Sequence, residues 1–142
     1  MRITYSLLLI LFLSFFGCKD NQEVQKEKKL YVMAEPSEMT TLMMEMYAYN
    51  EGFKKQILEG NLTTDFPERF QNIHSAVLTN PTMKDSSFED FASQFIEAQK
   101  LVFEAPQEEL TTHYNNAINA CISCHNVKCV GPIPRIKKLL IK

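Results

Sequence analysis

Three residues near the C-terminus have the types and the spacing to bind an iron porphyrin covalently. Cys121, Cys124 and His125 form the chain's one C-x-x-C-H motif, the pattern to which c-type haem is attached. In such a motif the two cysteine sulfurs form thioethers with the vinyl groups of the haem, and the histidine reaches the iron from the same side. The motif therefore predicts one covalent haem c, with His125 as the proximal iron ligand.

The N-terminus predicts that the chain is exported. Residues 1–17 carry one base and no acid, and their apolar run from Leu7 to Phe16 is typical of a secretory signal peptide. The run is too short and too close to the terminus for a lone spanning helix. Gly17 and Cys18 resemble the end of a bacterial lipobox, in which the cysteine is diacylated before cleavage. We expect a lipoprotein anchored through Cys18 in the bacterial cell envelope, on the periplasmic side or the cell surface. An ordinary signal peptide with an incidental cysteine is the alternative.

Composition limits the class of protein and the partners. Without residues 1–17 the chain has 14 Lys and Arg against 17 Asp and Glu, a formal charge of −3, which disfavours nucleic acid as a partner. Residues 18–34 are mostly polar, so we expect a flexible tether that links the anchor to the rest of the chain. Residues 35–142 suit one small domain with one hydrophobic core.

Apolar side chains recur at helical spacing in four successive segments, which predicts four helices. Sequences of the capping-box type at Asp65 and Ser86 mark the starts of the second and third helices, and Gly60 and Pro106 mark stops. The expected helices begin at Pro36, Asp65, Ser86 and about Pro106, and they end at Gly60, before Pro81, before Pro106 and at His125.

These helices, joined by short polar turns, predict an all-α fold, an up-and-down four-helix bundle with a C-terminal haem-attachment helix. After that helix, the prolines between Gly131 and Arg135 argue against a regular helix. The tail that follows is expected to pack its apolar side on the bundle, with its lysines in water. Bundles build cofactor sites between facing helices, so we expect the haem to lie between the first and last helices, with Leu42 and Ile118 among its contacts.

A helical bundle with a single C-x-x-C-H motif on its last helix resembles class II cytochrome c, the cytochrome c-prime family. The resemblance covers roughly residues 36–128. Class II members place an aromatic residue and an arginine where this chain has Lys128 and Cys129, and many carry an arginine in the first helix near a haem propionate. The first helix here has no base before Lys54, so that contact is not carried over. Arg69 and Arg135 are candidate substitutes that we expect on the surface.

The resemblance leaves the sixth iron position open, because some class II members have a methionine of the first helix on the iron and carry electrons, whereas others have an open distal side and bind small gases. The first helix of this chain holds Met39, Met43, Met44 and Met46, of which Met43 is central on the core-facing side. We expect Met43 as the distal ligand and single-electron transfer outside the cytoplasm as the function. The alternative is a five-coordinate haem protein that binds NO or CO as a sensor or scavenger, with the methionines as core packing.

The remaining histidines and cysteine are expected to stay outside the ligand set. His74 and His113 have no partner motif and are expected at the surface or rim. Together with Cys129, the motif residues have the types for a zinc site, and the two motif cysteines for a redox-active disulfide, but export and the helical pattern argue against both. Cys129 has no assigned role, and its pairing between two copies into a homodimer stays open.

The sequence offers no argument for an enzyme. It contains no nucleophile triad, phosphate loop or pair of catalytic carboxylates, and its scattered acids are better explained as helix surface. We expect contact with the membrane through the lipid anchor and with a redox protein that the sequence does not identify.

Overall fold

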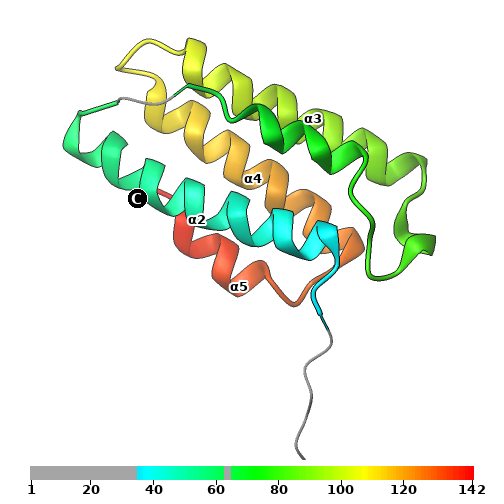
Figure 1. Ribbon diagram of the computed structural model, residues 1–142. Helices are drawn as coiled ribbons and strands as arrows, with labels where there is room; N and C mark the ends of the chain where they lie inside the picture. Colours follow the sequence, from blue (N-terminus) through cyan, green and yellow to red (C-terminus); the bar gives the residue numbers. More distant parts are fainter. Residues whose placement is uncertain (1–34, 63–64) are drawn as a thin grey trace, which may run out of the picture. The chain divides into compact units, whose positions relative to one another are not determined.

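In the computed structural model every regular element of the described residues, 35–62 and 65–142, is a helix (Figure 1). The all-α prediction is therefore confirmed, and no strand occurs in this part of the chain. None of its helices has the length and hydropathy needed to cross a bilayer. The expected signal peptide, Cys18 and the tether lie outside the described residues.

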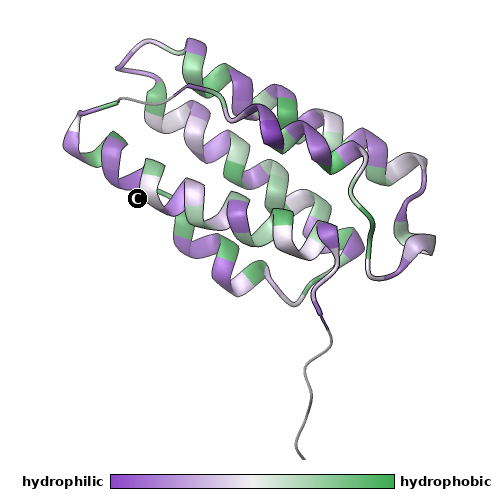
Figure 2. Cartoon of the chain, in the orientation of Figure 1, coloured by the Kyte–Doolittle hydropathy of each residue, from purple (hydrophilic) through white to green (hydrophobic). Residues whose placement is uncertain are grey.

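Three long helices carry most of the regular backbone, and four short helical segments connect or follow them. The long helices are α2 (Glu38–Glu59), α3 (Ser86–Glu104) and α4 (Leu110–Lys128). The short ones are the 3-10 segments η1 (Glu68–His74), η2 (Pro81–Met83) and η3 (Lys137–Leu139) and the one-turn helix α5 (Ile133–Ile136). Hydrophobic and hydrophilic residues alternate around the turns of the long helices, as amphipathic packing requires (Figure 2).

Helix α2 begins at Glu38, two residues after the predicted start at Pro36, and ends at Glu59, with the predicted Gly60 as its C-cap. The Ser37 hydroxyl accepts a hydrogen bond from the Thr40 N–H at 3.2 Å, which satisfies a donor that the first turn leaves unpaired. Gly60 follows the last turn in the left-handed conformation, with φ of 69°, and its N–H donates to the carbonyls of Gln56 and Ile57. A side chain is strained in that conformation, so the glycine determines this end of the helix.

Two glycines of this region are expected to respond to alanine with opposite signs. Gly60→Ala should lower the free energy of unfolding by about 1 kcal/mol, because alanine would have to adopt the left-handed conformation. Gly52→Ala, inside α2, should raise it by about 0.5–1 kcal/mol, because an added Cβ meets no atom within 4 Å and alanine favours the helix. Urea unfolding followed by circular dichroism measures both. A loss of the same size at both positions would contradict the glycine cap.

The predicted second helix, from Asp65 to before Pro81, is replaced by a shorter 3-10 segment. Only η1 forms, it starts after Pro67, and no side chain caps it, so the expected capping box is absent. The chain leaves the helical path because Val77 pairs with the start of α2. Its carbonyl accepts from the Met39 N–H at 3.0 Å, and its own N–H donates to the Glu38 carboxylate at 3.0 Å. The first bond satisfies an open N–H donor of the first turn of α2, and the second satisfies the N–H of Val77, so both replace bonds that a longer helix would make.

The ends of α3 and α4 differ from the prediction by one to four residues. Asp85 caps α3, one residue before the predicted start, and its carboxylate accepts from the Phe88 N–H at 2.9 Å. Helix α4 starts at Leu110, after a turn at residues 107–109, and continues three residues beyond His125.

The prediction that the residues after Gly131 are not helical is also wrong. Pro132 and Pro134 lie at the start of α5, where the missing N–H groups would have no helical partner in any case. The expected packing of the tail is confirmed: Ile136 and Leu139 are buried, whereas Lys137 and Lys138 are exposed.

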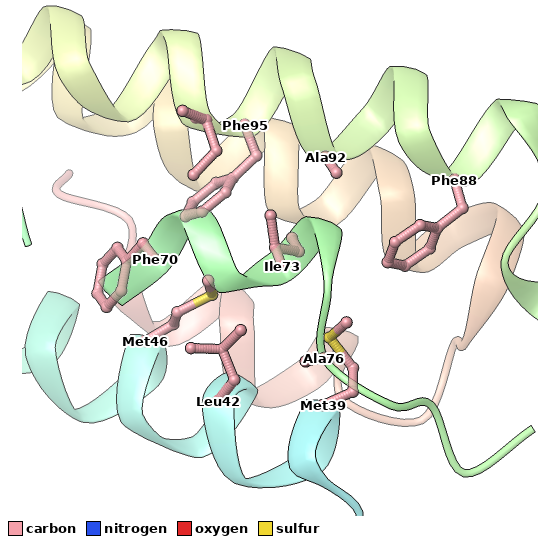
Figure 3. Packing of buried hydrophobic residues seen from close by; sticks show 10 residues of the cluster. Met39, Leu42, Met46, Phe70, Ile73, Ala76, Phe88, Ala92 and Phe95 are labelled. Carbon is pink, nitrogen blue, oxygen red and sulfur yellow. The ribbon is translucent and has the colours of Figure 1, made fainter. Parts of the chain in front are cut away.

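Two clusters of buried side chains hold these elements together. The first joins α2, η1 and α3, and Figure 3 shows Leu42 and Met46 of α2 pointing toward Phe70 and Ile73 of η1, with Phe95 of α3 on the opposite side. The second joins α2, α3, α4 and the tail, and its buried members are Phe53, Ile57, Val102, Leu110, Tyr114, Ala117, Ile118, Ile136 and Leu139. Helix α3 packs against α4 along its length, whereas α2 approaches η1 and η3 more closely than it approaches α4.

Candidate functional site

The C-x-x-C-H motif lies in the C-terminal half of α4. Cys121, Cys124 and His125 occupy positions i, i+3 and i+4, so the helix places them on one face. That face points toward α2, and at this point a cavity separates α2 from α4.

Three adjacent cavities occupy this space. The tail cavity, of about 240 Å³, lies between α2, α4 and the C-terminal segment. The turn cavity, of about 320 Å³, lies between the start of α2, residues 78–83 and the end of α4. The α3 cavity, of about 30 Å³, lies toward α3. Met43 and His125 are the two residues that line all three, one from each side.

The walls of the cavities are mostly apolar and rich in sulfur. Cys121 lines the tail and α3 cavities, and Cys124 lines the turn and α3 cavities. The apolar side chains around the two larger cavities are Met39, Met43, Met44, Met46, Leu78, Met83, Phe88, Ile136 and Leu139. Such walls suit a large apolar ligand, and methionines adapt their shape to a flat one.

The backbone at the end of α4 orients the imidazole of His125. Its Nδ1 lies 2.9 Å from the carbonyl oxygen of Cys129. Because a carbonyl only accepts, Nδ1 carries the proton and donates it, which leaves the lone pair of Nε2 for a ligand. Metal-binding histidines typically donate their second ring N–H to such a group, which holds the ring and its tautomer. The Cys129 N–H donates in return to the His125 carbonyl at 3.0 Å.

The two motif cysteines are partly buried neutral thiols. The Cys121 thiol donates to the Ala117 carbonyl, with an Sγ to oxygen distance of 3.4 Å, and burial raises its pKa to about 12. Burial also raises the pKa of Cys124, an effect that the charge of Lys128 partly opposes. Thiol–disulfide catalysts depend on the thiolate form, so these pKa values argue against a redox-active disulfide.

The side chains that the zinc alternative requires do not form a metal site in the described residues. Within residues 35–62 and 65–142, no three His, Cys, Asp or Glu side chains come together in a group that could hold a metal ion. Cys129, the fourth ligand of that alternative, has an exposed side chain, and its carbonyl rather than its sulfur contacts His125.

Leu42 and Ile118, which are expected to contact the cofactor, are buried in the two core clusters. Leu42 belongs to the cluster around η1, and Ile118 is fully buried in the cluster that joins α4 to the tail. Neither lines any of the three cavities. One residue along a helix turns the side chain by about 100°, so Leu42 faces η1 while Met43 faces α4.

The C-terminal segment forms one wall of the tail cavity, and this wall is not predicted from the sequence. Arg135, Ile136 and Leu139 line the tail cavity, and the guanidinium carbon of Arg135 lies 3.9 Å from the centroid of the Tyr47 ring. The spacing of Ile136 and Leu139 was the available signal, since positions i and i+3 share a helical face. Arg69, the other arginine considered, pairs with Glu45 on the surface.

Two α-helical side chains hold this segment in place. Lys54 of α2 donates to the carbonyls of Lys138 and Leu140 at 3.0 and 2.7 Å. Asn115 of α4 donates to the Ile141 carbonyl and accepts from the Ile141 N–H, each at 2.9 Å. The wall of the tail cavity is thus fixed to both helices that border it.

Asn50 places an unpaired polar atom at the tail cavity. Its side chain is buried, and Nδ2 donates to the Met46 carbonyl at 2.9 Å. Its Oδ1 has no hydrogen-bond partner among the described residues. A buried acceptor without a partner costs about 1–3 kcal/mol.

The other two histidines lie outside the three cavities. His74 Nδ1 lies 2.8 Å from a Glu89 carboxylate oxygen, between η1 and α3. His113 Nε2 lies 3.4 Å from Glu109, at the start of α4. Neither lines the tail, turn or α3 cavity.

An ion pair lies beside the turn cavity, which Lys128 lines. Lys128 Nζ donates to the Asp85 carboxylate at 2.6 Å, and the same carboxylate accepts from the Phe88 N–H and the Ser87 hydroxyl. The bond from Lys128, followed by those from Phe88 and Ser87, holds the pKa of Asp85 well below its usual range. A lowered pKa stabilises the folded state above the unfolded pKa of about 3.8, and this contribution is lost as the pH falls below that value.

Asp85→Asn should therefore lower the melting temperature at neutral pH and weaken its fall on acidification. Thermal unfolding at a series of pH values from about 7 to about 2 measures this dependence. Asp90→Asn, at an exposed acid of the same helix, is the matched control and should follow the unaltered protein. Parallel curves for all three proteins would show that the pair with Lys128 does not stabilise the fold.

No family model, curated protein or solved structure matches the chain. Its function is therefore inferred from its own residues and geometry.

Proposed function

We propose that the protein is a monohaem c-type cytochrome that transfers single electrons. The observation that carries this proposal is the position of Met43 and His125, which come from facing helices and line all three cavities. Cys121 and Cys124 line two cavities each, so the groups for covalent attachment border the same space as the two proposed iron ligands.

The residues fit haem c in type and placement. Cys121 and Cys124 are thiols available for thioether bonds, His125 keeps Nε2 free because Nδ1 is bound, and Met43 offers a thioether opposite. When bound, haem c would supply a one-electron iron couple, whose potential the thioether of Met43 would raise. The apolar walls of the cavities would limit the access of water to the iron and the rearrangement between oxidation states.

The arrangement of the helices supports a shortened version of the four-helix bundle of class II cytochromes, with three long helices. Helices α2, α3 and α4 provide three long members, with the motif on the last of them. Segment η1 takes the place of the second helix, because Phe70 and Ile73 fill the space between α2 and α3 (Figure 3). Two buried apolar anchors are enough for that contact, so a full helix is not required there.

The membrane-related parts of this proposal come from the sequence. Residues 1–17 as a signal peptide, Cys18 as the lipidated residue and residues 18–34 as a tether would hold residues 35–142 at a membrane of the bacterial cell envelope. The cytochrome would then exchange electrons with a redox protein on the same side of that membrane.

Space beside Met43 favours the alternative function, a five-coordinate haem protein that binds NO or CO. The tail cavity extends from Met43 to Ile136 and Leu139, and the part of it that the haem leaves free would hold a diatomic ligand if Met43 stays off the iron. The two functions share the attachment residues and differ in the sixth iron position.

Expression with haem-attachment machinery tests both functions. We expect the haem to stay with the chain on denaturation, and we expect the reduced protein to show the spectrum of a six-coordinate iron that binds carbon monoxide slowly. Rapid binding of carbon monoxide by the unaltered protein would select the gas-binding function. A chain without covalent haem would contradict both.

A further inference from the structure

Acidic and basic residues are unevenly distributed along the chain. It has 17 acids against 15 bases, yet the last acid is Glu109, so residues 110–142 contain no Asp or Glu. The bases in this stretch are Lys128, Arg135, Lys137, Lys138 and Lys142. Helix α4 and the tail, which border the candidate haem site, are therefore positive in a chain whose net charge is negative.

Several of these bases gather on one surface. Lys54, Leu58, Lys137, Lys138 and Lys142 surround a shallow hollow that Leu140 and Ile141 also line, and we call these residues the tail surface. Leu58 is 64% exposed, and the three lysines of the tail are exposed as well. None of the ion pairs among the described residues involves a lysine of this surface. The tail surface is thus basic, partly apolar and without carboxylate partners.

The tail surface and the tail cavity lie on opposite sides of the same segment. Arg135, Ile136 and Leu139 line the cavity, whereas Lys137 and Lys138 line the hollow. A helical segment with its side chains is about 10 Å thick. A molecule that covers the tail surface therefore approaches the cavity to within the thickness of one segment.

We propose that an acidic electron-transfer protein docks on the tail surface and exchanges single electrons with the haem through α5 and η3. This inference rests on the proposed function. The lysines of the tail surface, whose charges no carboxylate among the described residues neutralises, would attract an acidic surface and speed the encounter, and Leu58 would add apolar contact. In each exchange one protein loses one electron and the other gains it, and no bond or proton has to move.

The proposed function favours a protein over a membrane as the occupant, because a redox protein can accept or supply an electron and a lipid cannot. The tail surface also offers both kinds of contact that a protein surface can match. Its lysines stand beside the exposed Leu58 and the half-buried Leu140 and Ile141.

Ferricyanide, a trivalent anion that accepts one electron to become ferrocyanide, serves as the probe. With the reduced full-length protein, the negative net charge predicts that the oxidation rate rises with ionic strength, whereas the tail surface predicts that it falls. We expect a fall of about fivefold between about 10 mM and about 0.5 M salt. Lys137→Glu with Lys138→Glu should reverse the slope, whereas the matched pair Lys84→Glu with Lys100→Glu should keep its sign.

A second measurement tests the positive charge of the tail surface independently of the haem. Despite its negative net charge, the full-length protein should be retained on a sulfonate cation exchanger at neutral pH, before and after haem attachment, and the variant at Lys137 and Lys138 should elute early. Absence of retention, or an oxidation rate that rises with salt, would overturn the docking proposal. A chain that is retained but carries no covalent haem would overturn the proposed function, and the docking proposal with it.

Two further outcomes decide where the electron leaves and what binds. If the variant at Lys137 and Lys138 loses retention but oxidises with unchanged salt dependence, the electron leaves elsewhere and the proposal fails. If hydrogen exchange in residues 133–142 slows when the protein is anchored in anionic vesicles but not in zwitterionic ones, the surface binds lipid. That result would also overturn docking of an acidic protein.

Discussion

Cys121→Ala combined with Cys124→Ala is expected to abolish covalent haem attachment and to leave the helices folded. Each of these cysteines lines two of the three cavities, whereas Cys129, the third free cysteine of the described residues, lines only the turn cavity and lies outside the motif. Each substitution removes one sulfur from a partly buried side chain, at a cost of about 1 kcal/mol or less. Mass spectrometry after denaturation measures the attached haem, and circular dichroism measures the helices.

Cys129→Ala is the matched control for this experiment. Cys129 is also a free cysteine near His125, but its side chain is exposed and it lies outside the motif. Its carbonyl, which holds His125, remains in the variant, so the haem should stay attached at the level of the unaltered protein. Haem retained by the double variant, or lost on Cys129→Ala, would show that the attachment site has been assigned to the wrong sulfurs.

Helices α2 and α3 could be predicted from the sequence because their ends are marked locally, whereas no side chain caps α4, whose start was predicted four residues too early. Ser37 and Gly60 bound α2 through contacts within one turn, and Asp85 caps α3 in the same way. The second helix could not be predicted, since the bonds that end it join Val77 to the start of α2, about forty positions earlier in the chain. Only the folded chain brings those groups together.

The candidate site could likewise be predicted only where its residues are close together in the sequence. The motif is local, so Cys121, Cys124 and His125 share a face of α4 in any helix that contains them. Which side of α2 faces α4 depends on packing between distant parts of the chain, and the sequence does not determine it. Leu42 was for that reason predicted at the cofactor, whereas the structure buries it in the cluster around η1. Arg135 reaches the tail cavity because Lys54 and Asn115 fix the tail, which no sequence pattern indicates.

Met43→Leu is expected to retain covalent haem but to remove the iron-to-methionine charge-transfer band of the oxidised protein, to lower the redox potential and to permit rapid binding of carbon monoxide. Met43 is the methionine that shares all three cavities with His125, so it is the thioether best placed to complete the coordination of the iron. Leucine conserves the volume, so the substitution should cost less than about 1.5 kcal/mol of stability.

Met46→Leu separates ligation from packing. Met46 lies one turn further along α2 and lines the tail and α3 cavities, but it is buried in the cluster around η1, where Figure 3 shows it beside Leu42. Its substitution should keep the charge-transfer band and the slow reaction with carbon monoxide. A band lost on Met46→Leu would move the ligand to Met46. Rapid carbon monoxide binding in the unaltered protein and in both variants would instead indicate a five-coordinate iron, because no thioether would have to leave the iron before the gas could bind. Met43 would then shape a gas-binding cavity.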